Sequence, residues 1–178
     1  MGPGIHSPPM KVPRWTGLLL LVAAVGVGAG LAYEGLKPEP APQVDYVLLD
    51  GSKHASAQAW SGKVMLVNFW ATSCTTCVKE MPQVIATHQK YKDKGFDTLA
   101  VAMSYDPPAY VSNYAETRQL PFGVAMDSTG EIARRFGKVQ LTPTTFLINK
   151  RGEIVKRFVG EPDFAALHGT IEKLLAES

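Results

Sequence analysis

Cys74 and Cys77 are the only cysteines in the sequence, and two residues separate them. A thiol pair at this spacing can cycle between a dithiol and a disulfide. Any disulfide within the chain must join these two residues. Because so short a loop restricts the unfolded chain very little, such a disulfide would be a poor structural brace. The pair therefore favours thiol–disulfide exchange, with an inert disulfide as the alternative.

Metal binding is a second chemistry open to thiols. A structural zinc site needs four ligands, so two cysteines leave half of the set to other side chains. The histidines are scattered and have no ligand spacing to the cysteines: His6, His54, His88 and His168. We therefore expect no metal and no cofactor beyond a redox-active Cys74–Cys77 disulfide. The net charge of +2 gives no strong field to select nucleic acid or an acidic partner.

The cysteine pair lies where a predicted strand ends and a predicted helix begins. Val64–Trp70 (VMLVNFW) is a continuous apolar run, typical of a strand buried on both faces. A helix is predicted over Cys77–Tyr91, with Pro82 as a kink. A helix N-terminus favours a thiolate and lowers its pKa. We therefore predict that Cys74 attacks and that the more buried Cys77 resolves the mixed disulfide.

Further predicted strands and helices alternate along residues 44–178. The predicted strands are Val44–Leu49, Thr98–Met103, and a hairpin formed by Thr144–Ile148 and Ile154–Val159. The predicted helices are Tyr110–Thr117, Glu131–Phe136 and Phe164–Leu175. This order indicates one α/β domain with a central mixed β-sheet flanked by helices.

Residues 15–33 carry no charged side chain and read WTGLLLLVAAVGVGAGLAY. As a helix this run would be about 28 Å long, close to a bilayer core of roughly 30 Å. Lys11 and Arg14 precede it, so the positive-inside rule places residues 1–14 in the cytoplasm. The sequence thus predicts a transmembrane signal-anchor with the folded domain on the other side of the membrane.

Two other interpretations of this apolar run stay open. Gly30-Leu31-Ala32 fits a signal-peptide cleavage site, although the run is longer than a usual signal peptide core. The other interpretation is a buried helix of the domain, although the glycines in the run weaken a helix in water. Both the anchor and the signal peptide place the domain in an oxidising compartment. Residues 34–43, which include KPEPAP, are predicted to be a stiff Pro-rich linker.

Residues 70–77 (WATSCTTC) resemble the thioredoxin superfamily. Residues 62–72 and 79–82 are similar to the membrane-anchored TlpA/ResA/CcmG branch of that superfamily. Residues 141–146 (LTPTTF) match its cis-proline segment, and residues 106–127 match its characteristic insertion. The resemblance covers nearly the whole domain. It implies a thioredoxin-like fold and a thiol–disulfide oxidoreductase that reduces disulfides in partner proteins.

The resemblance also implies roles for single residues. A cis Thr142–Pro143 bond beside the disulfide would present backbone atoms of Thr142 to an extended substrate. Glu80 would lie near the cysteines, where burial raises its pKa and lets it relay a proton. An ordinary trans proline and a solvated carboxylate are the alternatives. Asn68 stands where thioredoxin has a buried acid, and its side-chain amide cannot titrate. Trp70 is predicted to pack beneath the site.

The sequence departs from the branch at the cysteines themselves. Ser73 stands where the branch usually has tryptophan, and the loss of this aromatic side chain opens the rim of the site. Thr75 and Thr76 separate the cysteines, with no proline between them. Both departures alter the reduction potential and therefore bear on the direction of electron flow and the choice of partner.

For partners, the branch implies apocytochrome c or copper-site assembly proteins, with a membrane thiol-reducing protein as electron donor. The implied location is the bacterial inner membrane, single-pass, with the catalytic domain on the periplasmic side. One alternative is a copper-binding assembly factor or adaptor, which needs wider cysteine spacing and a distal histidine, and His168 is poorly placed for that. The other is a peroxiredoxin-like peroxidase, for which Thr72 fits loosely and no proline precedes it nearby.

Overall fold

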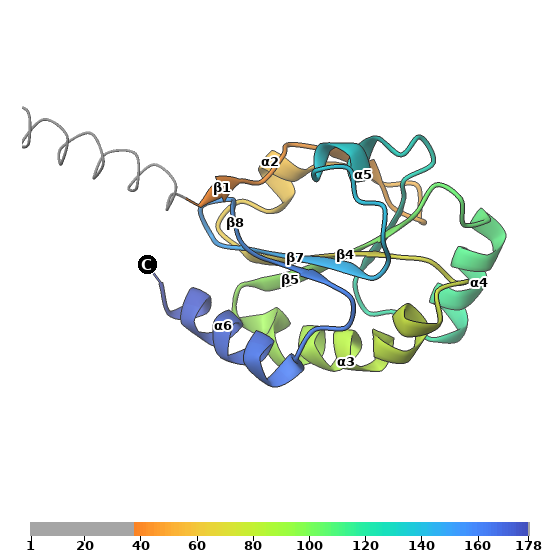
Figure 1. The fold of residues 1–178 in the computed structure, drawn as a ribbon. Helices are drawn as coiled ribbons and strands as arrows, with labels where there is room; N and C mark the ends of the chain where they lie inside the picture. Colours follow the sequence, from red (N-terminus) through yellow and green to blue (C-terminus); the bar gives the residue numbers. More distant parts are fainter. Residues whose placement is uncertain (1–37, 178) are drawn as a thin grey trace, which may run out of the picture. The chain divides into compact units, whose positions relative to one another are not determined.

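The computed structural model describes residues 38–177 (Figure 1). Within this range, no helix is both long enough and apolar enough to span a membrane. The predicted cytoplasmic tail, residues 1–14, and the predicted membrane span, residues 15–33, lie outside the described residues. Both therefore stay predictions.

A mixed β-sheet of six strands forms the centre of the domain, in the order β1-β8-β7-β4-β5-β6. The strands are β1 (Glu39–Pro40), β4 (Val64–Trp70), β5 (Phe96–Ala102), β6 (Gly123–Met126), β7 (Thr144–Ile148) and β8 (Glu153–Val159). β4, β5 and β6 run parallel, whereas β7 is antiparallel to both β4 and β8. A separate antiparallel pair consists of β2 (Asp45–Val47) and β3 (Lys53–Ala55).

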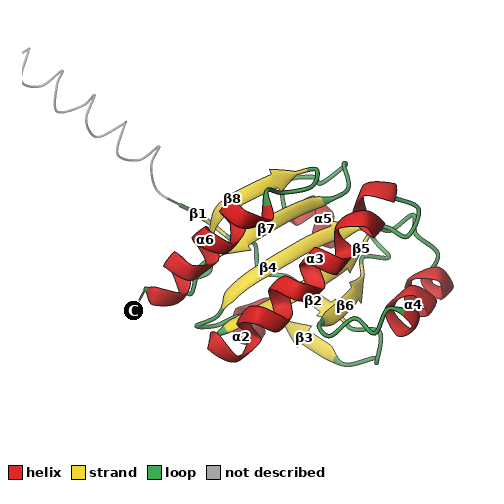
Figure 2. Cartoon of the chain, turned by 90° about the horizontal axis from the view of Figure 1, so that it is seen from below, coloured by secondary structure: helices red, strands yellow, loops and turns green. Residues whose placement is uncertain are grey.

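Helices cover both faces of the sheet. They are α2 (Ser56–Ala59), α3 (Thr75–Tyr91), α4 (Pro108–Thr117), α5 (Glu131–Arg135) and α6 (Phe164–Ala176), with a 3-10 turn η1 (Lys92–Lys94) after α3. Figures 1 and 2 show α3 and α6 side by side on one face, with α2 and α5 on the other. The predicted α/β architecture, a mixed sheet between helices, is confirmed.

β4 is buried along its whole length because strands flank it and helices cover both of its faces. Its side chains alternate between two apolar clusters, as the period of a strand requires. Trp70 faces the cluster that includes α3 and α6. Phe69 faces the opposite cluster, where it meets Phe136 and Phe146 edge to face at centroid distances of 5.4 and 5.9 Å. The strand that leads into the cysteine pair is thus anchored on both sides.

The first strand of the sheet lies inside the predicted linker, residues 34–43. Glu39 and Pro40 pair with Ile154 and Glu153 of β8, and the backbone N–H of Ala41 donates to the Gly152 carbonyl at 2.8 Å. Proline is tolerated here because β1 is an edge strand that needs few ladder donors. The end of the predicted spacer is therefore part of the folded domain, which begins before residue 44.

Several short elements were not predicted from the sequence. β3, β6 and α2 each have at most four residues, too few for a hydrophobic period to show. β6 also begins with a glycine, Gly123, which is uncommon in strands. The helix predicted to begin at Cys77 starts earlier, at Thr75, because Cys74 is its N-cap.

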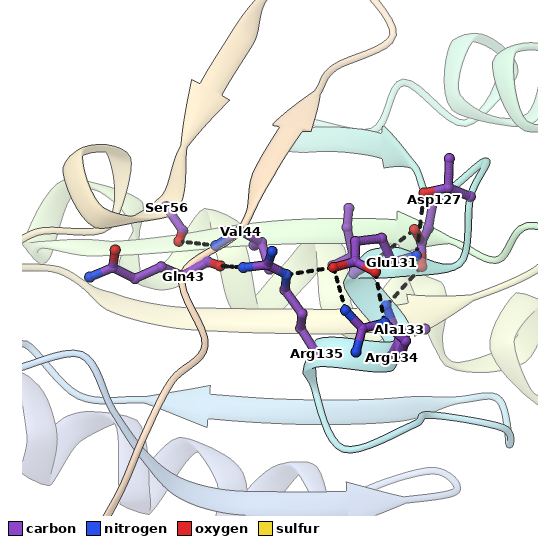
Figure 3. A network of polar contacts seen from close by, with 10 residues as sticks. Gln43, Val44, Ser56, Asp127, Glu131, Ala133, Arg134 and Arg135 are labelled. Atoms are coloured by element: carbon purple, nitrogen blue, oxygen red, sulfur yellow. Dashed lines mark hydrogen bonds and ion pairs between the residues drawn. The ribbon is translucent and has the colours of Figure 1, made fainter.

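A polar network joins α5 to the segment that precedes β2 (Figure 3). Buried Asp127 accepts hydrogen bonds from the backbone N–H groups of Ile132 at 3.0 Å and Ala133 at 2.8 Å. Arg135 donates to the Gln43 carbonyl at 2.9 Å and to Glu131 at 2.7 Å. These contacts satisfy the first turn of a short helix and fix it against the segment that enters the domain.

Candidate active site

Cys74 and Cys77 form a disulfide at the start of α3, with their Cα atoms 5.2 Å apart. Figure 1 shows how β4 leads to this point before the chain turns back beneath the sheet as α3. The Cys74 sulfur accepts a hydrogen bond from the Cys77 backbone N–H at 3.2 Å, the position that a serine or aspartate oxygen takes at other N-caps. The Cys74 sulfur therefore sits at the positive end of the helix, where a thiolate is stabilised.

The two sulfurs differ in their access to solvent. Cys74 is partly buried and has exposed neighbours, Ser73 and Thr75, while Thr76 is exposed as well. Cys77 has no exposed surface. Cys74 is therefore the more accessible of the two cysteines to a partner protein.

Asp106 holds the loop that precedes the cysteines. Its carboxylate accepts the Thr72 backbone N–H and the Thr72 hydroxyl, each at 2.6 Å. Asp106 is 2% exposed, and hydrogen bonds to a buried charge are strong. Sequence reasoning missed this contact because the two residues are 34 positions apart. The available signal was an acid just beyond a buried strand, at the edge where parallel strands end.

Glu80 lies in the second turn of α3 and is 1% exposed. Burial raises the pKa of its carboxyl to about 7, the nearby Glu161 charge adds to this, and a hydrogen bond from Asn68 opposes it. The Asn68 amide nitrogen lies 3.1 Å from Glu80 Oε1 and 2.9 Å from the Thr145 hydroxyl. Glu80 is therefore not the solvated helix carboxylate that the sequence left as an alternative.

Two acceptor oxygens of this cluster, Glu80 Oε2 and Asn68 Oδ1, are buried without a hydrogen-bond partner among the described residues. A buried carboxylate oxygen without a donor disfavours the charged form. Protonation at Oε2 removes that cost. A carboxyl with a pKa near 7 can both hold and release a proton near neutral pH, which is the property that general acid–base chemistry requires.

Trp70 is the last residue of β4, and Pro143 directly precedes β7, the neighbouring strand. Trp70 has no exposed surface and packs against Tyr114 of α4 at a centroid distance of 5.1 Å, as predicted for a packing residue. The Thr142–Pro143 peptide bond is cis, as predicted. Because Phe69 pairs with Thr144, Pro143 lies at the edge of the sheet from which the cysteine loop leaves.

Each histidine of the described range has a hydroxyl partner. His54 contacts Ser52, His88 contacts Thr98, and His168 contacts Thr87. Between residues 38 and 177, no group of three or more His, Cys, Asp or Glu side chains is arranged to hold a metal ion.

Comparison with known proteins places the chain in a family. The Redoxin family profile matches residues 37–171. The chain belongs to the Redoxin family. This Redoxin-family protein is 33% identical over 162 residues to the thiol-disulfide oxidoreductase ResA of Bacillus cereus (strain ATCC 10987 / NRS 248). The alignment covers 88% of this chain and 92% of ResA.

Solved structures agree with this family. A thioredoxin-like protein from Neisseria meningitidis is 42% identical with a TM-score of 0.73, covering 80% of this chain and 93% of that one. A thiol:disulfide interchange protein from Chlorobium tepidum TLS is 30% identical with a TM-score of 0.71. The match covers 79% of this chain and 98% of that one. The predicted thioredoxin-like fold and the resemblance to the ResA branch are confirmed, and this Redoxin-family chain is a thiol–disulfide oxidoreductase.

Proposed function

We propose that the protein reduces disulfides in partner proteins through the Cys74–Cys77 pair. The Cys74 thiolate attacks one sulfur of a partner disulfide, so that a mixed disulfide forms as the partner bond breaks and one partner thiolate leaves. The Cys77 thiolate then attacks the Cys74 sulfur and releases the second partner thiolate. Two electrons pass to the partner, and the protein is left with the Cys74–Cys77 disulfide.

One observation carries this proposal. Cys74 is partly exposed as the N-cap of α3, while Cys77, one turn further along, has no exposed surface. Attack and resolution need this asymmetry, because a mixed disulfide must form at one sulfur and be cleared by the other. Glu80 then serves as the proton store of the cycle, taking up or giving back a proton as the thiols change charge.

The partner class follows from the resemblance to the TlpA/ResA/CcmG branch. It consists of disulfide-containing apocytochrome c or copper-site assembly proteins, with a membrane thiol-reducing protein as the electron donor. The Thr142–Pro143 segment, which lies beside the end of β4, binds the extended partner chain through its backbone. The cycle uses no cofactor besides the cysteine pair.

The location follows from the N-terminal sequence. Residues 15–33 anchor the protein in the bacterial inner membrane as a single pass, and residues 1–14 remain in the cytoplasm. The catalytic domain then works on the periplasmic side. Alkaline extraction of membranes tests this proposal, since release of the full-length chain into the soluble fraction contradicts an anchor.

Trapping of mixed disulfides in cells tests the function. Full-length Cys77→Ser keeps the attacking thiol but cannot resolve, so it should accumulate partner proteins that a reductant releases. Full-length Cys74→Ser is the matched control and should trap none. Equal trapping by both variants, or by neither, contradicts the proposed cycle. Tight stoichiometric Cu(I) binding without disulfide reductase activity would instead establish the copper-binding alternative.

A further inference from the structure

Tyr105 connects the two segments that flank the cysteine loop. Its phenol oxygen lies 3.3 Å from the Thr142 hydroxyl. We propose that Tyr105 determines specificity for the partner. Its ring forms one wall of the position where the partner's residue next to the reacting cysteine sits, and its hydroxyl positions Thr142. This inference rests on the proposed function, because it names the substrate class of the same site.

The strand order places Tyr105 and Thr142 on opposite sides of the cysteine loop. β4 lies between β7 and β5, and the loop to Cys74 continues β4. Tyr105 follows the end of β5, which is tied to β4 by the hydrogen bond from the Met103 N–H to the Trp70 carbonyl at 3.0 Å. Thr142 precedes the start of β7, which pairs with the end of β4. The hydrogen bond between them therefore links the two walls of the site.

The edge of the sheet from which the cysteine loop leaves offers apolar surface. Tyr105 is 57% exposed, Leu141 is 65% exposed, and both belong to segments at this edge of the sheet. Val159, which pairs with Thr144 at the same edge, is 57% exposed. Ser73 presents no aromatic surface beside the reactive sulfur, so Tyr105 supplies the aromatic surface from another loop.

The apolar ring of Tyr105 determines which kind of partner residue can pack against it. An exposed phenol ring gains free energy by covering an apolar side chain and gains nothing from a carboxylate. The partner class is therefore an extended segment whose disulfide cysteine has an apolar residue next to it. Reduction of that disulfide follows the two exchange steps given above, with two electrons passing from Cys74 and Cys77 to the partner.

Two synthetic peptides test this inference. Each carries one cysteine as a mixed disulfide with glutathione, and they differ only in whether leucine or aspartate stands beside the cysteine. In single-turnover reactions with each peptide in excess, the full-length reduced protein should prefer the leucine peptide through its KM, taken as the peptide concentration that gives half of the maximal rate. The maximal single-turnover rate constant, kcat, should be nearly equal for the two peptides. Tyr105→Ala should raise the KM for the leucine peptide by roughly 5- to 30-fold and abolish the preference.

Tyr105→Phe separates the ring from the hydroxyl. It keeps the apolar wall, so the preference should remain, while the lost hydrogen bond to Thr142 raises KM for both peptides by roughly 2- to 10-fold. Tyr110→Ala is the matched control, since Tyr110 is 65% exposed on α4. The rate of Cys74 alkylation by iodoacetamide should not change in Tyr110→Ala.

Each result bears on the inference. Unchanged KM values in Tyr105→Ala, or equal effects from Tyr110→Ala, would overturn it. If Tyr105→Ala does not fold, Tyr105→Lys decides, because a cation at this wall should reverse the preference toward the aspartate peptide, and an unchanged preference contradicts the inference. A wild-type protein that reduces both peptides equally overturns the inference alone, whereas one that reduces neither overturns the proposed function.

Discussion

The side-chain amide of Asn68 donates to Glu80 Oε1 at 3.1 Å, inside a core where neither residue is more than 1% exposed. Burial disfavours the charged carboxylate, and the amide hydrogen bond favours it. The balance leaves the pKa of Glu80 at about 7. The hydrogen bond from a neutral amide thus offsets part of the effect of burial on the one acid that lies in the same helix as the cysteines.

Asn68→Leu should raise the pKa of Glu80 above its wild-type value, because the hydrogen bond that lowers this pKa is lost while burial remains. NMR titration of the Glu80 side-chain carboxyl carbon in the oxidised protein measures the change. Thr145→Val is the matched control, since it removes the other hydrogen bond of Asn68 and leaves the contact with Glu80. A pKa that stays at the wild-type value in Asn68→Leu contradicts the proposed balance.

Glu80→Gln should change the pH dependence of Cys74 reactivity. In the wild-type protein, Glu80 gains its charge near pH 7, and a nearby negative charge disfavours a thiolate. The alkylation rate of the reduced protein should therefore show a transition near pH 7 that the glutamine variant lacks. Identical rate profiles for the two proteins would reduce Glu80 to a packing residue.

The raised pKa of Glu80 also makes stability depend on pH. The folded protein holds this proton more tightly than the unfolded chain, so its stabilising effect is complete below pH 4.5. It is lost as the pH rises to about 7, by an amount on the order of 3 kcal/mol in the free energy of unfolding. Urea denaturation of the oxidised protein between pH 4.5 and 8 should show this fall.

Two variants serve as references for that measurement. Glu80→Gln should show a flatter pH dependence than the wild-type protein, because no proton is exchanged at this position. Glu116→Gln, which changes an exposed carboxylate of α4, should keep the wild-type slope. A fall of the same size in Glu80→Gln assigns the effect to other groups.

Cys74 in the reduced protein should react with iodoacetamide faster than Cys77 near neutral pH. Its sulfur lies at the N-terminus of α3 and is partly exposed, whereas Cys77 has no exposed surface. Both cysteines lie in one tryptic peptide, residues 64–79, so fragment ions from tandem mass spectrometry after short labelling times resolve the two rates, with each single Cys→Ser variant as the standard. Faster labelling of Cys77 contradicts the assigned roles.

Thr72→Val should destabilise the protein by about 1–3 kcal/mol, because it leaves one oxygen of the buried Asp106 carboxylate without its donor. Thr72→Ser keeps the hydroxyl and is the matched control, with a much smaller loss. Urea denaturation of the oxidised forms gives both values. Equal losses in the two variants contradict the prediction, because Thr72→Val removes the hydroxyl and keeps the methyl group, whereas Thr72→Ser keeps the hydroxyl.

The sequence by itself was sufficient for the chemistry and for most of the architecture. Cys74 and Cys77 at the end of an apolar run, before an amphipathic helix, indicated the reaction and the N-terminal location of the pair on its helix. These inferences depend on local patterns, such as spacing, period and end signals, that a chain carries along its length. The cis Thr142–Pro143 bond and the raised pKa of Glu80 followed from the resemblance.

Only the tertiary structure decided which distant residues meet at the site. Asp106 reaches Thr72, Tyr105 reaches Thr142, and Thr145 reaches Asn68, all over separations of more than 30 positions. The sheet order decides these contacts, because it places β4 between β5 and β7 and so joins the loops at their ends. No local pattern encodes that order, since it depends on which buried faces pack together once the whole chain is folded.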